Sequence, residues 1–332
     1  MKKTKRLLSV AIALVAMASV LPVSAQQMRI PVGTDILTSR GDVNGDGFVD
    51  IADIGAIIDI MSGRSIISET LSESGDEVTF NIIGFPLKMY RVKAGTFTMG
   101  STEFDNEKWP RKVTITKDFF IAETEVTQRF WTALMGEAHI PSTNGYTQWI
   151  TTFGMDDDYP AYYLSWDMCK DFIDKLNALT KRQFRMPTEA EWEYAAKGGH
   201  KSQGYKFAGS NDCNEVAWYD ENAALPGLGS PDYGCHPVKT KKPNELGLYD
   251  MSGNVMEWCS DWYQKSFVTA TLVDPQGPET GSGRVLKGGS WGSSDTYCRP
   301  AGRDVSAPDK QFQGNGLRLA LTPIYVEENT GK

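Results

Sequence analysis

The chain has 332 residues with a formal net charge of -8, and 40% of its residues are hydrophobic and 11% aromatic. This composition is sufficient for a packed core, and the length allows one large domain or two smaller ones. The acidic balance argues against a duplex nucleic-acid binder, because such proteins neutralise phosphates with clustered lysines and arginines.

The N-terminus has the pattern of a secretory signal peptide. Residues 1–6 are basic, residues 7–21 are apolar and uncharged, and a small-residue cleavage site ends at Ala25. The apolar run is shorter than the roughly 20 residues that span a bilayer. We therefore expect a signal peptide at 1–25, no membrane span, and a secreted, periplasmic or cell-surface protein.

Export would permit disulfides. There are five cysteines, Cys169, Cys213, Cys235, Cys259 and Cys298. Because the number is odd, at least one has no partner within the chain, and the apolar helical face around Cys169 predicts that this one is buried and free. The other four allow three connectivities; spacing favours Cys213–Cys235 with Cys259–Cys298, without deciding among them.

A calcium-binding loop is predicted directly after the signal peptide. Gly47 would permit the sharp turn of an EF-hand loop and Phe48 would supply its backbone carbonyl. The oxygen-bearing side chains at loop positions 1, 3, 5, 9 and 12 are those of Asp42, Asn44, Asp46, Asp50 and Asp53. An apolar series at helical spacing follows, so that 38–64 resembles one dockerin repeat. The alternative is an acidic turn without metal. Dockerins usually carry two repeats and bind cohesins, so a cohesin partner is a secondary hypothesis.

A connector at 65–88 leads into a large domain at 89–322, followed by a tail at 323–332. Strands are predicted at 78–83, 90–100 (interrupted by a turn) and 113–116. Three helices have N-terminal caps: 128–135 after Thr127, one beginning after Ser165, and 190–197 with a capping box formed by Thr188 and Glu191. Beyond Gly198 the pattern predicts mostly loops.

Eight motifs in order resemble the formylglycine-generating-enzyme (sulfatase-modifying-factor) family over residues 89–322. They are AGTFTMGS (94–101), ETEVTQ (123–128), LSW (164–166), RMPTEAEWEYAA (185–196), GLYDM (247–251), GNVMEW (253–258), GGSW (288–291) and GLR (316–318). The resemblance implies an α+β fold, a loop-rich variant of the C-type-lectin fold.

The family's reaction converts a sulfatase cysteine to formylglycine with oxygen and copper(I), a soft metal that prefers sulfur ligands. The resemblance places the two copper-binding cysteines after Gly-Gly-Ser-Trp. In this chain Cys298 occupies the second position, whereas Ser293 replaces the first cysteine. Because a hydroxyl is a poor substitute for a thiolate, we expect the oxidase to be lost and copper to be absent.

Two other catalytic interpretations are weaker. The segment around Ser290 matches the hydrolase pattern G-x-S-x-G, but no histidine follows it and no helix is predicted after it. No zinc motif is present. The resemblance also implies structural calcium at an Asn-x-x-Glu motif, through Asn254, the carbonyl of Val255, and Glu257; a loop capped by Glu257 is the alternative.

Three functional hypotheses follow. The first is a secreted, non-catalytic binding or structural protein with calcium-stabilised loops, whose residues 292–313 line a surface for an unknown protein, peptide or glycan. The second is a formylglycine-generating oxidase that tolerates Ser293. The third is a subunit that the calcium repeat docks into an extracellular assembly.

Overall fold

The computed structural model describes residues 67–72, 74–136, 149–265 and 271–323, and two short strands before them. The chain divides into two compact units, residues 1–68 with 81–86, and residues 69–80 with 87–332. In the first unit, β1 (Ile30–Pro31) pairs antiparallel with β2 (Phe48–Val49). Apart from Phe48 and Val49 in β2, the predicted calcium loop lies outside the described residues, as do the signal peptide and the tail beyond residue 323.

The largest sheet has six strands in the order β3-β4-β5-β8-β15-β9. These are β3 (Ile67–Leu71), β4 (Glu77–Ile82), β5 (Phe85–Val92), β8 (Phe119–Ala122), β15 (Ala320–Leu321) and β9 (Phe184–Arg185). Alternate side chains of β4 are buried, as expected for a sheet with one covered face. Strand β15 joins the C-terminal end of the described chain to two segments that are far from it in sequence.

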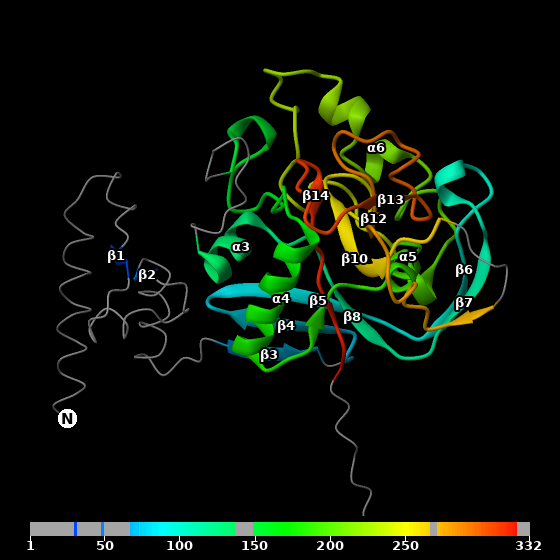
Figure 1. Ribbon diagram of the computed structural model, residues 1–332, viewed down its shortest axis with the longest axis horizontal. Helices are drawn as coiled ribbons and strands as arrows, with labels where there is room; N and C mark the ends of the chain where they lie inside the picture. Colours follow the sequence, from blue (N-terminus) through cyan, green and yellow to red (C-terminus); the bar gives the residue numbers. More distant parts are fainter. Residues whose placement is uncertain are drawn as a thin grey trace, which may run out of the picture. The chain divides into compact units, whose positions relative to one another are not determined.

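Helices α3 (Gln128–Met135) and α4 (Trp166–Thr180) pack against each other, as Figure 1 shows. The Trp131 ring of α3 stacks on Phe172 of α4 with centroids 5.0 Å apart. The hydroxyls of Thr127 and Ser165 accept hydrogen bonds from backbone N–H groups of the first turns. Both helix starts predicted from these caps are therefore confirmed.

Helix α5 (Glu189–Ala196) contacts strands of a three-stranded and a four-stranded sheet (Figure 1). One sheet has the order β11-β7-β6, formed by β11 (Leu272–Val273), β7 (Arg111–Ile115) and β6 (Gly95–Met99). The other has the order β13-β12-β10-β14, formed by β13 (Arg303–Ser306), β12 (Arg284–Lys287), β10 (Met256–Trp262) and β14 (Asn315–Gly316). The predicted capping box of Thr188 and Glu191 is present, and Trp192 is fully buried in the core between these sheets.

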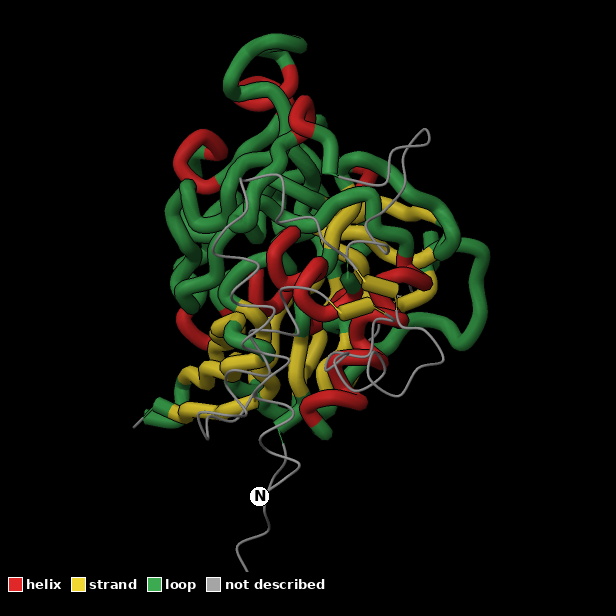
Figure 2. Tube along the Cα trace, turned by 90° about the vertical axis from the view of Figure 1, so that its left-hand side faces the viewer, coloured by secondary structure: helices red, strands yellow, loops and turns green. Residues whose placement is uncertain are grey.

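Long loops gather at one end of the second unit, away from most strands (Figure 2). The short helical elements of the second unit are one turn each: α6 (Cys213–Val216), the π-helical turn Asp220–Ala224, and 3₁₀ turns at Asp105–Glu107, Thr151–Phe153 and Gly199–Lys201. The expected loop-rich α+β architecture is thus confirmed, although β10 formed where loops were expected. No helix in the described ranges is both long and apolar enough to cross a membrane.

Candidate functional site

The segment after β12 forms a tight turn at Ser290–Ser293. Gly288 and Gly289 introduce it with φ angles of +90° and +70°, which favour glycine. The Ser293 hydroxyl accepts a hydrogen bond from the Ser290 N–H at 3.0 Å, and the two hydroxyls lie 3.1 Å apart. Of the three residues predicted at the catalytic position, Ser290, Ser293 and Cys298, the structure brings the two serines together. Their hydroxyl groups are hydrogen-bonded to each other.

Cys298, the third predicted site residue, belongs to a buried cluster beside this turn. It is 0% exposed. Its neighbours in the cluster are Phe207, Cys213, Val216, Ala217 and Tyr219. A hydrogen bond with Cys213, and then burial, raise the pKa of the Cys298 thiol well above its ordinary value. The donors at the two family positions are thus a protonated, buried thiol and the Ser293 hydroxyl, which is hydrogen-bonded to Ser290. This donor set does not fit the two thiolates with which the family binds copper(I).

Aromatic side chains pack around the turn. Trp291 is buried, and its ring lies 5.6 Å from that of Phe153 and 5.2 Å from that of Tyr233. The carbonyl of Ser293 accepts a hydrogen bond from Asp220 N, which attaches the π-helical turn to the same place.

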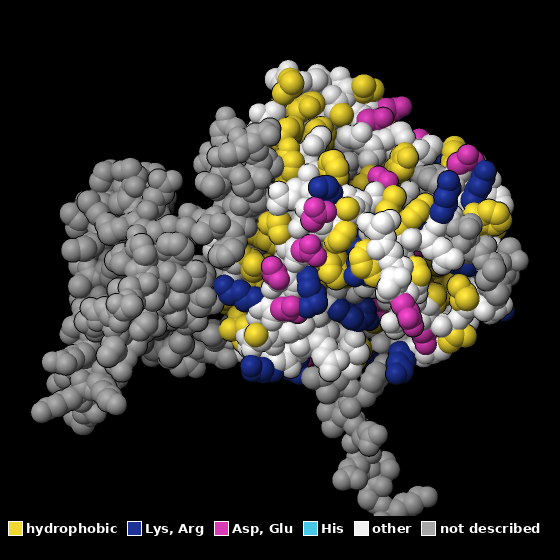
Figure 3. All heavy atoms as spheres, in the orientation of Figure 1, with side chains coloured by type: hydrophobic (Ala, Val, Ile, Leu, Met, Phe, Trp, Pro, Cys, Tyr) yellow, Lys and Arg dark blue, Asp and Glu magenta, His cyan; other side chains and the backbone are white. Residues whose placement is uncertain are grey.

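The loop that follows this π-helical turn exposes Leu225 and Leu228, with exposed fractions of 74% and 76%. Hydrophobic side chains are visible at this end of the unit in Figure 3. We call the Ser290–Ser293 turn, the Phe153, Tyr233 and Trp291 rings, and this loop the Trp291 surface.

The Asn-x-x-Glu motif is buried, and its side-chain oxygens already have protein partners. The Asn254 side-chain oxygen accepts a hydrogen bond from His236 N at 2.9 Å. Both Glu257 carboxylate oxygens accept hydrogen bonds from Arg318, and one also accepts from Trp192 at 2.5 Å. The backbone N–H of Val255 donates to Glu125 at 3.3 Å.

Two further acids, which the sequence did not single out, join this motif. Glu125 and Asp250 are 2% and 3% exposed, and both lie close enough to Glu257 and Arg318 to interact electrostatically. Burial raises the pKa of Asp250 to about 6, and burial together with Asp250 raises the pKa of Glu125. Three carboxyl groups thus share one buried guanidinium, an imbalance that a proton or a cation would offset.

The excess negative charge of these three carboxyl groups would suit a divalent cation, but their side chains do not converge on one point. In the described ranges, no three His, Cys, Asp or Glu side chains converge at metal-binding distance. Calcium at Asn254, Val255 and Glu257 therefore stays a prediction. The N-terminal ligands Asp42, Asn44, Asp46, Asp50 and Asp53 lie outside the described residues, so that calcium there also stays a prediction.

The disulfide pairing suggested by spacing is wrong in this structure. All five cysteines are buried and free, which agrees with the expectation for Cys169. Cys298 shares a buried cluster with Cys213, whereas Cys259 belongs to the core cluster that contains Trp192. The Cys235 thiol donates to the carbonyl of Phe153 at 2.8 Å. Spacing failed because loops bring together residues that are distant along the chain.

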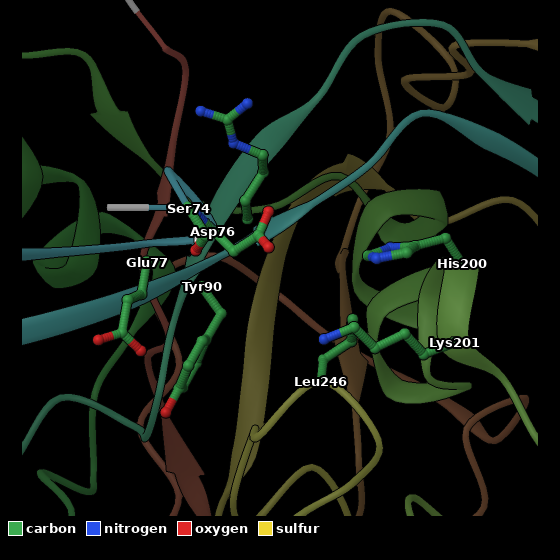
Figure 4. A pocket seen from close by; sticks show the side chains of 8 residues that line it. Ser74, Asp76, Glu77, Tyr90, His200, Lys201 and Leu246 are labelled. Carbon is green, nitrogen blue, oxygen red and sulfur yellow. Dashed lines mark hydrogen bonds between the residues drawn. The ribbon is translucent and has the colours of Figure 1, made fainter. Parts of the chain in front are cut away.

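A small polar pocket of about 170 Å³ shares no residue with the Trp291 surface. His200 and Lys201 face Asp76 across it (Figure 4). Its acids have lysine partners, since Lys88 lies 3.0 Å from Glu77 and Lys93 lies 3.7 Å from Asp76. We assign it no ligand.

Known proteins resemble the chain over most of the second unit. Chaperone protein LppX of Paenibacillus barcinonensis is 32% identical over 68% of this chain and 84% of that protein. The formylglycine-generating enzyme of Thermomonospora curvata is 36% identical, but the match spans only 50% of this chain and 57% of the enzyme. The solved structure of Treponema denticola variable protein 1 aligns with a TM-score of 0.62 and 31% identity, covering 74% of this chain and 99% of that one.

These likenesses agree with the architecture of short curled sheets and few helices, which is that expected for the formylglycine-generating-enzyme variant of the C-type-lectin fold. The model of one family matches residues 86–323, more than half of the chain. The chain therefore belongs to the family described as the sulfatase-modifying factor enzyme 1-like domain.

Proposed function

We propose that this protein is an exported, non-catalytic binding scaffold whose Trp291 surface holds a polypeptide segment. The observation that carries the proposal is the donor set at the family's catalytic position. Ser293 supplies a hydroxyl that is hydrogen-bonded to Ser290, and the Cys298 thiol is buried with Cys213 in an apolar cluster. The family's pair of copper-binding cysteines is therefore incomplete here, and the other thiol of the cluster, Cys213, is buried on α6 instead of occupying the Ser293 position.

The chemistry of the surface favours a polypeptide with apolar and basic side chains. Leu225 and Leu228 are exposed on the loop that follows the π-helical turn, and exposed apolar groups mark many protein-binding surfaces. Asp220 lies next to Glu221 and Asp295, and burial followed by these like charges raises the pKa of Asp220. A cationic partner would relieve this repulsion. The relative LppX is named a chaperone protein, which supports a polypeptide as the ligand.

Fluorescence anisotropy with labelled peptides about 12 residues long tests the proposal. We expect a peptide rich in leucine and lysine to bind more tightly than one of equal length rich in leucine and glutamate. The double variant Leu225→Ser/Leu228→Ser should weaken binding about fivefold or more, which corresponds to roughly 1 kcal/mol. Val273→Ser is the matched control, because Val273 is 62% exposed on β11. Equal weakening by the control, or no binding of either peptide, would contradict the proposal.

The oxidase alternative has a direct test. The purified protein, reduced and supplied with copper(I), is incubated in air with a Cys-x-Pro-x-Arg peptide, and the peptide is followed by mass spectrometry. We expect no aldehyde from the natural sequence. Aldehyde from Ser293→Cys alone would show that one ligand separates this protein from the enzymes. Aldehyde from the natural sequence would refute the non-catalytic assignment.

We also propose calcium for this protein, at the N-terminal repeat and near the buried acids of the large domain. Hard oxygen donors in the spacing of residues 42–53 support the first site, and the excess of buried carboxyl groups supports the second. Docking into an assembly through the repeat is the secondary proposal. Its test is a pull-down with a cohesin in calcium and in EDTA, and capture in calcium alone is the supporting result.

A further inference from the structure

Two buried thiols from distant parts of the chain meet beside the Trp291 surface. Cys213 begins α6 and is 6% exposed, and Cys298 follows the Ser290–Ser293 turn and is 0% exposed. They belong to one apolar cluster, and Cys213 is close enough to raise the pKa of the Cys298 thiol. The other three cysteines have different surroundings: Cys169 in α4, Cys235 bonded to a backbone carbonyl, and Cys259 in the main core.

The backbone on both sides of this thiol pair is held in place. The Asp212 side chain caps α6 by accepting from Asn214 N at 3.0 Å. The carbonyl of Cys298 accepts from the Ser252 hydroxyl at 2.7 Å. The hydrogen bond from Asp220 N to the Ser293 carbonyl ties the two segments together nearby. These contacts, which do not involve sulfur, fix the two backbone segments that carry Cys213 and Cys298.

We propose that Cys213 and Cys298 form a disulfide when the chain folds in an oxidising environment. One protein thiolate attacks a small-molecule disulfide such as glutathione disulfide, giving a mixed disulfide and one glutathione. The second thiolate then displaces the other glutathione, so that two protein thiols and one glutathione disulfide yield one protein disulfide and two glutathiones. Its occurrence in the cell rests on the export predicted from residues 1–25.

The bond would join the ends of a segment of roughly 85 residues that contains most of the long loops, and cross-links across long segments restrict the unfolded chain most. The disulfide would also leave Cys298 without a thiolate with which to bind copper(I). Because both thiols are buried, exchange in the folded protein should be slow, and the bond should form during folding.

Refolding of the reduced full chain in a glutathione redox buffer tests the inference, followed by alkylation under denaturing conditions and peptide mass mapping. We expect a cross-linked peptide containing Cys213 and Cys298, with the other three of the five cysteines alkylated. Five alkylated cysteines, or a different pair, would overturn the proposal. This readout needs no substituted protein, so that a misfolded variant cannot obscure it.

Substituted proteins add an independent measurement. A reductant should lower the midpoint of thermal unfolding of the natural sequence by roughly 5–10 °C. Cys213→Ala and Cys298→Ala should each abolish this sensitivity, whereas Cys169→Ala, the matched buried control, should retain it. Sensitivity that persists in either of the first two variants would refute the pairing. Neither measurement depends on peptide binding, so that this proposal and the proposed function can fail separately.

Discussion

Glu257→Gln removes a charge from a buried ion pair that also makes hydrogen bonds to Trp192 and to two backbone carbonyls. Glu257 and Arg318 are both 0% exposed, and Arg318 also donates to the carbonyls of Ala122 and Tyr249. Two unit charges about 4 Å apart interact by roughly 4 kcal/mol at an effective dielectric constant near 20. Glutamine keeps the size of the side chain and an oxygen for Trp192, so that the loss is mainly electrostatic.

Loss of one partner from a buried pair typically costs about 3–5 kcal/mol. We expect the lower end, about 3 kcal/mol of unfolding free energy, because Glu125 and Asp250 would ionise more readily once Glu257 is neutral. Chemical denaturation in EDTA measures the change, and Glu257→Gln/Arg318→Met should be less destabilised than the sum of its single variants. A loss below about 1 kcal/mol in EDTA, with a larger loss in calcium, would refute the ion-pair reasoning and indicate that Glu257 is a calcium ligand.

Three further predictions concern stability and metal binding. The pKa of Asp261 is raised to about 7 by burial and then by Glu189, so the folded state holds a proton that the unfolded state releases near pH 4. The free energy of unfolding should therefore fall as pH rises from about 4 to about 7, by at most roughly 1.4 kcal/mol per pH unit from this group. In Asp261→Asn this part of the pH dependence should be absent. If the free energies of unfolding of the variant and the natural sequence differ by the same amount at every pH, the reasoning is contradicted. Thr188→Ala should cost about 1 kcal/mol in chemical denaturation, because it removes the hydroxyl that accepts from Glu191 N at 3.1 Å; no loss would mean that tertiary packing alone sets the start of α5. Asp46→Asn should lower the calcium bound per full-length chain in equilibrium dialysis, whereas Asp309→Asn should not, and equal stoichiometry in both would count against the N-terminal loop.

Local signals in the sequence predicted the helices well. Thr127, Ser165 and Thr188 each cap a helix through a hydrogen bond to a residue three positions along the chain. Such contacts need no knowledge of the rest of the fold, and a glycine at the other end, as at Gly136, ends α3 within one residue. The strand-turn-strand at 90–100 followed in the same way from alternation and turn residues.

Contacts between distant residues could not be predicted in this way. Residues 256–262 were expected to be loop, yet they form β10, because β12 and β14 supply its hydrogen-bonding partners. Likewise, the Asn-x-x-Glu motif gave no indication that Glu257 pairs with Arg318, or that Asp250 and Glu125 lie beside it. A signal for the last two was present, since both acids fall within family motifs, but only folding shows that they are buried together.

Buried charge explains how a domain with so little regular structure can hold a defined surface. The Glu257–Arg318 pair is attached to α5 through Trp192, to β8 through Ala122, and to a loop through Tyr249. A second buried group, in which Lys287 of β12 lies 3.2 Å from Glu193 of α5, anchors the strand that leads directly into the Ser290–Ser293 turn. These anchors do not involve Ser293 or Cys298. A serine in place of the family's cysteine would therefore change the donor atoms at the turn while leaving the supports of the surface intact, which is what the proposed binding function requires.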